Sequence, residues 1–99
     1  MAIGTIIRLS EGMGAEQYDA VQAQVDIESE PVEGLIFHSA GELEGSFQVF
    51  NVWDTRESFD RFRTDRLRPA MVAAMGEEKV AALPDPDVVE VSIHNYVIP

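Results

Sequence analysis

The order in which strand-like and helix-like segments follow one another constrains the fold of this chain more than any other feature of its sequence. Runs of β-branched and aromatic residues predict strands, and apolar residues three or four positions apart predict helices. In chain order we expect a strand at 3–9, a helix at 15–27, strands at 34–40 and 46–53, a helix from 54 that resumes over 71–83 after Pro69, and a strand at 88–98. This is the ferredoxin-like βαββαβ order, an α+β fold in which one four-stranded antiparallel sheet carries both helices on one face.

Turn-forming residues set the expected connections and the expected register of the sheet. Pro31 ends the first helix, because proline cannot continue a helix and restricts the residue before it. Residues 41–45 begin and end with glycine and have the length of a hairpin connection. In the simplest register this hairpin pairs His38 with Gln48 and places both on the face that carries Phe50. A one-residue bulge would turn His38 to the other face.

The central strands are apolar on both faces, which is unusual for a sheet with helices on one side only. The third strand has Phe47, Val49 and Trp53 on one face, and it has Phe50 and Val52 on the other. Two helices can cover only one of these faces. We therefore expect a second copy of the chain to cover the other, in a homodimer that hides roughly 800 Å² or more on each subunit.

Composition and charge exclude several classes of protein. The chain has 99 residues, and we expect residues 1–99 to form a single domain. A formal net charge of −11 argues against binding nucleic acid or an anionic membrane, which both attract clustered Lys and Arg. Without cysteine there is no disulfide, thiolate zinc site or cysteine nucleophile. Because we find no export signal and no apolar run near the ~20 residues of a membrane span, the expected location is the cytoplasm.

Two segments resemble a known family. Residues 34–41 read GLIFHSAG, and residues 52–62 read VWDTRESFDRF, a strand that ends in Trp followed by a capped acidic turn and a Phe stripe. In these segments and in its order of elements, the chain resembles the small proteins grouped with antibiotic-biosynthesis monooxygenases in the dimeric α/β-barrel superfamily. The resemblance implies a homodimeric α/β barrel with a ligand cleft between the sheet and the helices of each subunit. The family includes cofactor-free oxygenases, haem-degrading enzymes, small isomerases and proteins without known activity.

The chain departs from the residue patterns of the enzymes in this family. The haem-degrading members take a His ligand from the second helix, where this chain has no His and Val72 stands at the matching position. Their Trp on that helix is matched by Phe62. The resemblance therefore disfavours haem degradation, and we expect no cofactor. Asn51 and Trp53 on the third strand are a partial counterpart of the Asn–Trp pair of the oxygenases.

The two histidines are the candidates for acid–base chemistry. His38 lies in an apolar strand, and if it faces the cleft it could act as a general base, because its pKa lies near the operating pH. The alternatives are a buried histidine with satisfied hydrogen bonds or a residue of the dimer interface. His94 lies near the end of the last strand and favours an interface or surface role. The two lie on different strands without metal-ligand spacing, so we expect no metal site.

Aromatic and basic side chains are the candidates for binding a ligand. Tyr18, Trp53, Phe59 and Phe62 could line an aromatic pocket or could form the core, and both interpretations remain open. Five of the seven basic residues lie on the second helix, where they could attract an anion or form a solvated face with i,i+3 and i,i+4 ion pairs. Of these, Arg66 follows the Phe stripe and is the candidate anion-binding residue.

Two functions follow from these features. The first is a small cofactor-independent enzyme, like an oxygenase or an isomerase, that takes a hydrophobic aromatic or anionic molecule into the sheet–helix cleft. His38 would then remove a proton and Arg66 would stabilise the anion. The second is a non-catalytic dimeric module that binds a small ligand or a protein partner. An open cavity beside His38 favours the first, and a filled core around it favours the second.

Overall fold

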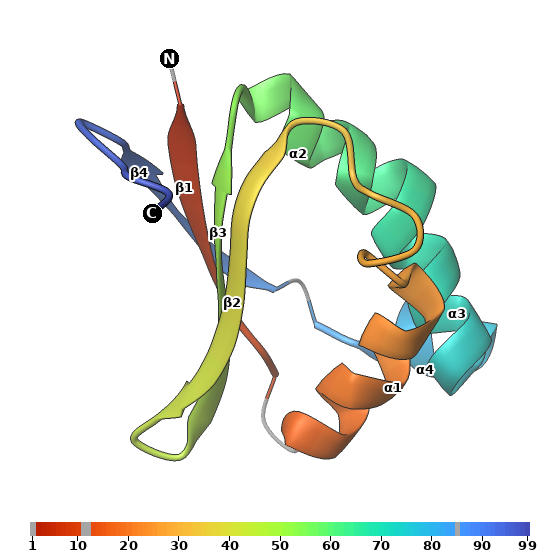
Figure 1. The fold of residues 1–99 in the computed structure, drawn as a ribbon. Coiled ribbons are helices and arrows are strands. Elements are labelled where there is room, and N and C mark those ends of the chain that lie inside the picture. The colour runs from red at the N-terminus through yellow and green to blue at the C-terminus, as the bar shows by residue number, and fades with distance from the viewer. Residues whose placement is uncertain (1, 11–12, 85) are drawn as a thin grey trace.

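The computed structural model describes residues 2–10, 13–84 and 86–99. Its elements are β1 (Ile3–Arg8), α1 (Ala15–Val25), β2 (Leu35–Leu43), β3 (Ser46–Trp53), α2 (Arg56–Phe62), a π-helical turn (Arg63–Leu67), α3 (Arg68–Met75), α4 (Glu77–Ala82) and β4 (Asp87–Ser92). The strands form one antiparallel sheet in the order β2-β3-β1-β4. The helices lie on one side of this sheet and leave its other side open (Figure 1). The ferredoxin-like α+β fold expected from the sequence is confirmed.

The register of the β2–β3 hairpin differs from the expected one, and the difference decides where His38 points. β2 continues to Leu43, and the turn is only Glu44 and Gly45, which have φ values of 51° and 81°. Such positive angles at both turn residues are typical of a tight two-residue hairpin. This turn places Leu43 opposite Ser46, and the pairing then runs without a break to His38 opposite Asn51; the bulge between Leu35 and Phe37 comes only after His38. The expected pairing of His38 with Gln48 is therefore wrong.

His38 pairs instead with Asn51, and Asn51 pairs on its other side with Thr5 of β1. Thr5 and Asn51 are buried between the sheet and the helices. Because directly paired residues point to the same face, the His38 side chain also faces the helices. The two-residue turn thus replaces the simple register, in which His38 would share a face with Phe50.

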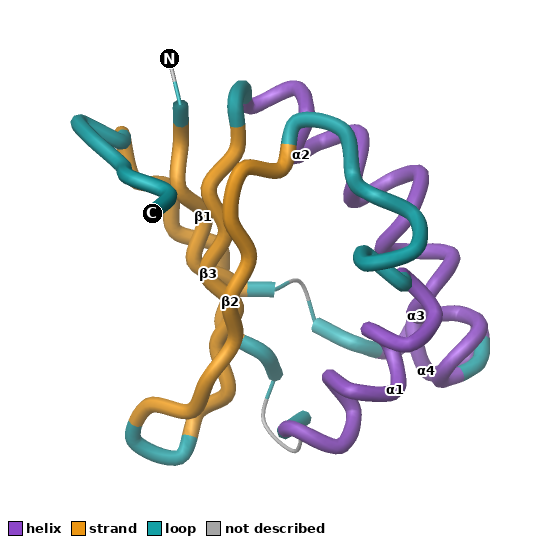
Figure 2. The backbone as a smooth tube through the Cα atoms, in the orientation of Figure 1, coloured by secondary structure: helices purple, strands orange, loops and turns teal. Residues whose placement is uncertain are grey.

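The long second helical region is interrupted, but not where proline was expected to break it. α2 passes through the π-helical turn into α3, and Pro69 lies in the first turn of α3, where the missing N–H is tolerated. The break comes at Gly76, whose φ is 92°. The first helix also ends earlier than expected, at Val25, and a long loop leads from it to β2 (Figure 2). Of the helices that the structure describes, none is long and apolar enough to cross a bilayer.

The last strand is shorter than the sequence predicts. β4 pairs with β1 only as far as Ser92, opposite Ile3, and the Ile93 N–H then donates to the Ala2 carbonyl. Among the described residues, the strand pairing of β4 stops at this point. Residues 93–99 therefore lie outside the sheet, and His94 is exposed there rather than held in a strand.

The core lies between the sheet and the helices and is built around Trp53. Trp53 and Phe59 are 0% and 1% exposed, and Phe62 is also buried. The Trp53 ring lies 5.7 Å from the ring of Phe59 and 5.3 Å from that of Phe62. Its indole N–H donates to the Thr5 hydroxyl over 3.1 Å, so the one polar atom of the ring is satisfied.

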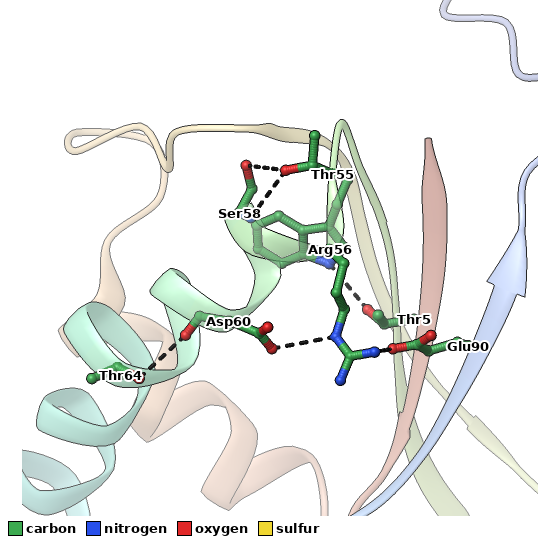
Figure 3. Close-up of polar contacts among 8 residues, drawn as sticks. Thr5, Thr55, Arg56, Ser58, Asp60, Thr64 and Glu90 are labelled. Carbon is green, nitrogen blue, oxygen red and sulfur yellow. Dashed lines mark hydrogen bonds and ion pairs between the residues drawn. The ribbon is translucent and has the colours of Figure 1, made fainter. Parts of the chain in front are cut away.

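The start of α2 is fixed to the rest of the molecule by polar contacts. The Thr55 hydroxyl caps the helix by accepting from the Ser58 N–H (Figure 3). The Ser58 hydroxyl in turn donates to Asp54 over 2.6 Å. Arg56 reaches between Asp60 on its own helix and Glu90 on β4, and so ties α2 to the edge of the sheet (Figure 3).

The open face of the sheet is apolar. It exposes Phe37, Leu43, Val89 and Val91. Phe50 lies among them, 6.4 Å from the Phe37 ring.

Candidate functional site

A chain of three hydrogen-bonded side chains crosses the layer between the sheet and α1. The Nδ1 atom of His38 lies 2.6 Å from Oδ1 of Asn51, and its Nε2 atom lies 2.5 Å from the hydroxyl oxygen of Tyr18. These side chains come from β2, β3 and α1. His38 and Tyr18 are half-buried, whereas Asn51 is 3% exposed. The imidazole is therefore held at both nitrogens.

Local structure explains why these residues meet. Antiparallel pairing sets Asn51 directly beside His38, on the face that the helices cover. A buried amide needs hydrogen-bond partners, and the imidazole supplies one. From α1, the Tyr18 ring stacks on that of His38, with centroids 6.1 Å apart and planes at 11°, and lies 5.2 Å from the Phe47 ring. Tyr18 thus connects α1 to the sheet.

The chemistry of the end groups gives the hydrogen-bond chain a direction. The carbonyl oxygen of Asn51 can only accept, so Nδ1 of His38 must donate to it. In the neutral imidazole Nε2 then carries the lone pair and accepts from the Tyr18 hydroxyl. The pKa of Tyr18 is raised, first by burial and second by the charge of Asp19, so its hydroxyl keeps its proton. This arrangement can accept a proton at Nε2.

The raised pKa of Tyr18 has a measurable consequence. The Tyr96→Phe variant leaves Tyr18 as the only tyrosine. In this variant we expect the phenolate absorbance to appear above the ordinary pKa of 10.0. The unfolded chain loses this proton at the ordinary pKa. The contribution of Tyr18 to the free energy of unfolding is therefore constant below about pH 10 and decreases as the pH rises beyond it. A spectrophotometric titration measures this, and a phenolate that appears at or below the pKa of the unfolded chain contradicts the burial of Tyr18.

The other aromatic residues that the sequence singles out lie in the core. Trp53, Phe59 and Phe62 contact one another with almost no exposed surface. The structure brings Tyr18 together with His38, and it adds Asn51 to this site. From the sequence, Asn51 was noted only as part of a partial counterpart of the Asn–Trp pair of the oxygenases. A polar residue in the middle of an apolar strand was the available signal for Asn51.

Arg66 is held by backbone carbonyls. Its guanidinium donates to the carbonyls of Val25 and Glu30, both over 2.7 Å, and more weakly to that of Pro31 over 3.4 Å. These carbonyls belong to the end of α1 and to the loop that follows, so Arg66 stabilises that helix end. The π-helical turn presents Arg66 to them.

Two surface hollows lie outside the His38 chain. One, of about 230 Å³, lies on the open face beside the β2–β3 hairpin and is lined by Ile6, Leu43 and Phe50 among others. A second, of about 250 Å³, lies beside Asp19, Asp26 and Glu28 of α1 and the loop after it. Neither includes Tyr18, His38 or Asn51. Within the described residues no group of three or more His, Asp or Glu side chains could hold a metal ion.

Comparisons with known proteins place the fold. No protein-family model and no curated protein matches the chain. Among solved structures, SnoaB, a cofactor-independent oxygenase from Streptomyces nogalater, is 13% identical with a TM-score of 0.63, over 97% of this chain and 96% of that one. A Caulobacter crescentus protein assigned to the antibiotic biosynthesis monooxygenases is 16% identical with a TM-score of 0.66, over 95% and 91%. A protein of unknown function from Nitrosomonas europaea is 15% identical with a TM-score of 0.65, over 99% and 92%.

These matches cover nearly the whole length of both chains. The protein therefore shares its fold with SnoaB and with the Caulobacter crescentus protein, and this agrees with the fold that the resemblance in its sequence implied. At these sequence identities the likeness concerns the fold, so any function must be argued from the side chains of this chain.

Proposed function

We propose that the protein binds a planar, hydrophobic molecule with an acidic hydrogen between α1 and the sheet, and that His38 is the base that receives the proton. The observation that carries this proposal is the pair of hydrogen bonds at His38, because they orient the imidazole and leave its lone pair on Nε2. Tyr18 and Phe47 supply aromatic surface beside it. The ligand class is a phenol, an enol or an aromatic acid.

Proton removal leaves an electron pair on the ligand, and two reactions can follow. With molecular oxygen as co-substrate, the anion would be oxygenated without a cofactor. Without oxygen, return of the proton to another atom of the ligand would isomerise it. The fold shared with a cofactor-independent oxygenase supports the first reaction by analogy only.

A non-catalytic binding module is the second candidate function. Neither of the two hollows includes His38, and two further observations favour the module over an enzyme with the full set of residues that the sequence suggested. Trp53 and Phe59 are sealed in the core, and the Arg66 guanidinium is engaged by three carbonyls. In this alternative, the Tyr18–His38–Asn51 chain only joins α1 to the sheet.

Binding of a coloured phenol distinguishes these functions. We expect 4-nitrophenol to bind the wild-type protein saturably and to shift toward its phenolate spectrum. His38→Gln removes the base, and since a hydrogen bond to a charged group is worth about 1.5–3 kcal/mol, affinity should fall about tenfold to a hundredfold. His94→Gln, at an exposed position, is the matched control and should bind like the wild type. Equal binding by both variants, or no binding by the wild type, would contradict the proposal that His38 is the base.

We also propose that a second copy of the chain covers the open face of the sheet. The exposed Phe37, Val89 and Val91 are the supporting observation. Light scattering at micromolar concentration should give twice the chain mass of 11.0 kDa. Val91→Glu, which places a charge in the proposed interface, should give 11.0 kDa, and Ala23→Glu on the exposed side of α1 should not. A wild-type monomer at this concentration contradicts the homodimer.

A further inference from the structure

We propose that Tyr18 is the ligand-facing end of a one-way proton chain, in which Asn51 is a positioning residue that fixes the tautomer of His38. This inference rests on the proposed function, because it assigns the residues through which His38 would receive a proton. It names Tyr18 rather than His38 as the group that meets the acidic hydrogen of the ligand.

The hydrogen bonds at both ring nitrogens of His38 lead to this assignment. Nδ1 is bonded to Asn51 and Nε2 to Tyr18, so neither nitrogen is free to approach a ligand directly. A hydroxyl group, in contrast, can donate one hydrogen bond and still accept others. Tyr18 is half-buried, and its hydroxyl can accept from a ligand while it donates to Nε2. A proton from the ligand would therefore reach His38 through the Tyr18 hydroxyl.

The transfer balances in protons and electrons. The ligand's X–H bond breaks and its electron pair stays on the ligand. The released proton forms a new O–H bond on Tyr18 as the original Tyr18 proton moves to Nε2. The products are a ligand anion, a neutral Tyr18 and a His38 imidazolium whose Nδ1–H still donates to Asn51. No oxidant or reductant takes part.

Asn51 sets the direction of the hydrogen bonds from Tyr18 to His38 and on to Asn51, and it carries no charge itself. Its amide oxygen holds the proton on Nδ1, which keeps the Nε2 lone pair aimed at Tyr18. A carboxylate in the same place would put a negative charge beside the imidazole, whereas the amide of Asn51 is neutral. Because Asn51 is buried beside Thr5 in the central strands, its side chain has little freedom to turn away.

Nitrogen-15 NMR of protein labelled at histidine tests the tautomer without any ligand. The chain has two histidines, and the exposed His94 serves as the internal reference. We expect neutral His38 in the wild type to carry its proton on Nδ1. Tyr18→Phe should leave that tautomer unchanged, Asn51→Leu should lose it, and Asn51→Asp should keep it. A wild-type His38 that carries its proton on Nε2 overturns the inference, whether or not the variants fold.

Binding of 4-nitrophenol tests the role of Tyr18. We expect Tyr18→Phe to weaken binding about tenfold or more and to abolish the phenolate shift, because the hydroxyl through which the proton would reach His38 is lost. Unchanged or tighter binding by this variant would mean that the phenol reaches Nε2 directly, and it would overturn the assignment to Tyr18. If the wild type binds no phenol, the proposed function fails together with the ligand-facing role of Tyr18, while the tautomer experiment still decides the role of Asn51.

Discussion

Replacing Trp53 by alanine is expected to lower the free energy of unfolding by about 3–5 kcal/mol, the usual cost of removing a fully buried large aromatic side chain. Trp53 is 0% exposed and its ring packs between those of Phe59 and Phe62. The alanine variant leaves a cavity there and takes the indole donor from the Thr5 hydroxyl. Because a domain of this size is stable by only about 5–15 kcal/mol, the variant should unfold at much lower denaturant concentration.

Chemical denaturation measures this effect, and two further variants separate its causes. Trp53→Phe keeps an aromatic ring in the core but removes the indole N–H, so we expect a smaller loss. Val97→Ala changes a side chain that is 74% exposed and should alter stability by less than about 0.5 kcal/mol. A Trp53→Ala protein as stable as Val97→Ala would show that Trp53 lines an open pocket rather than the core.

Replacing Gly34 by alanine is expected to cost about 2–5 kcal/mol, from a backbone penalty of about 1–2 and a packing penalty of about 1–3 kcal/mol. Gly34 has a φ of 83°, which residues with a Cβ atom rarely adopt. A Cβ atom there would lie 2.2 Å from the Ser58 hydroxyl and 2.6 Å from an Asp54 carboxylate oxygen. The Ser58–Asp54 contact that fixes the start of α2 would have to shift.

Gly45→Ala is the matched control for this prediction. Its φ of 81° is nearly the same, but nothing lies within 4 Å of the added Cβ. We therefore expect only the backbone penalty of about 1–2 kcal/mol. The difference between the two variants, measured by denaturant unfolding, isolates the clash with Ser58. Equal losses would mean that the loop before β2 does not pack on α2 as closely as the structure shows.

The order and type of the elements could be predicted because each long segment has one clear hydrophobic period. β3 is an example, since its expected range of 46–53 is also its observed range. The ends of the elements were harder to predict where pairing with a neighbouring strand decides them. Residues 93–98 have strand-like composition, yet the pairing of β4 with β1 ends at Ser92 opposite Ile3.

The register of β2 at His38 could not be predicted because the turn that sets it lacks the usual sequence signal. The bulge between Leu35 and Phe37 leaves no mark in composition either, but it changes only the pairing beyond Phe37. The two-residue turn uses Glu44 at a positive φ, where Asn, Asp or Gly is the usual signal. As a result, the sequence selected His38 but left its face open between two registers, and the structure shows that the simple one is not formed.

The candidate site was predicted in pieces. His38 and Tyr18 were singled out separately, as a base and as an aromatic residue, but only the three-dimensional arrangement joins them over 20 positions of sequence. Asn51 gained its role through the shifted register. Arg66 fits a helical stripe in the sequence, whereas the π-helical turn directs its guanidinium to the carbonyls at the end of α1.

The most direct test of a proton-accepting site at His38 is to add 4-nitrophenol to protein labelled with nitrogen-15 at histidine. We expect the two ring nitrogens of His38 to shift saturably toward the imidazolium pattern as the phenolate spectrum appears, with the signals of His94 unchanged. If His38 does not respond, or if both histidines respond equally, the Tyr18–His38–Asn51 chain is a structural link between α1 and the sheet and not a ligand site.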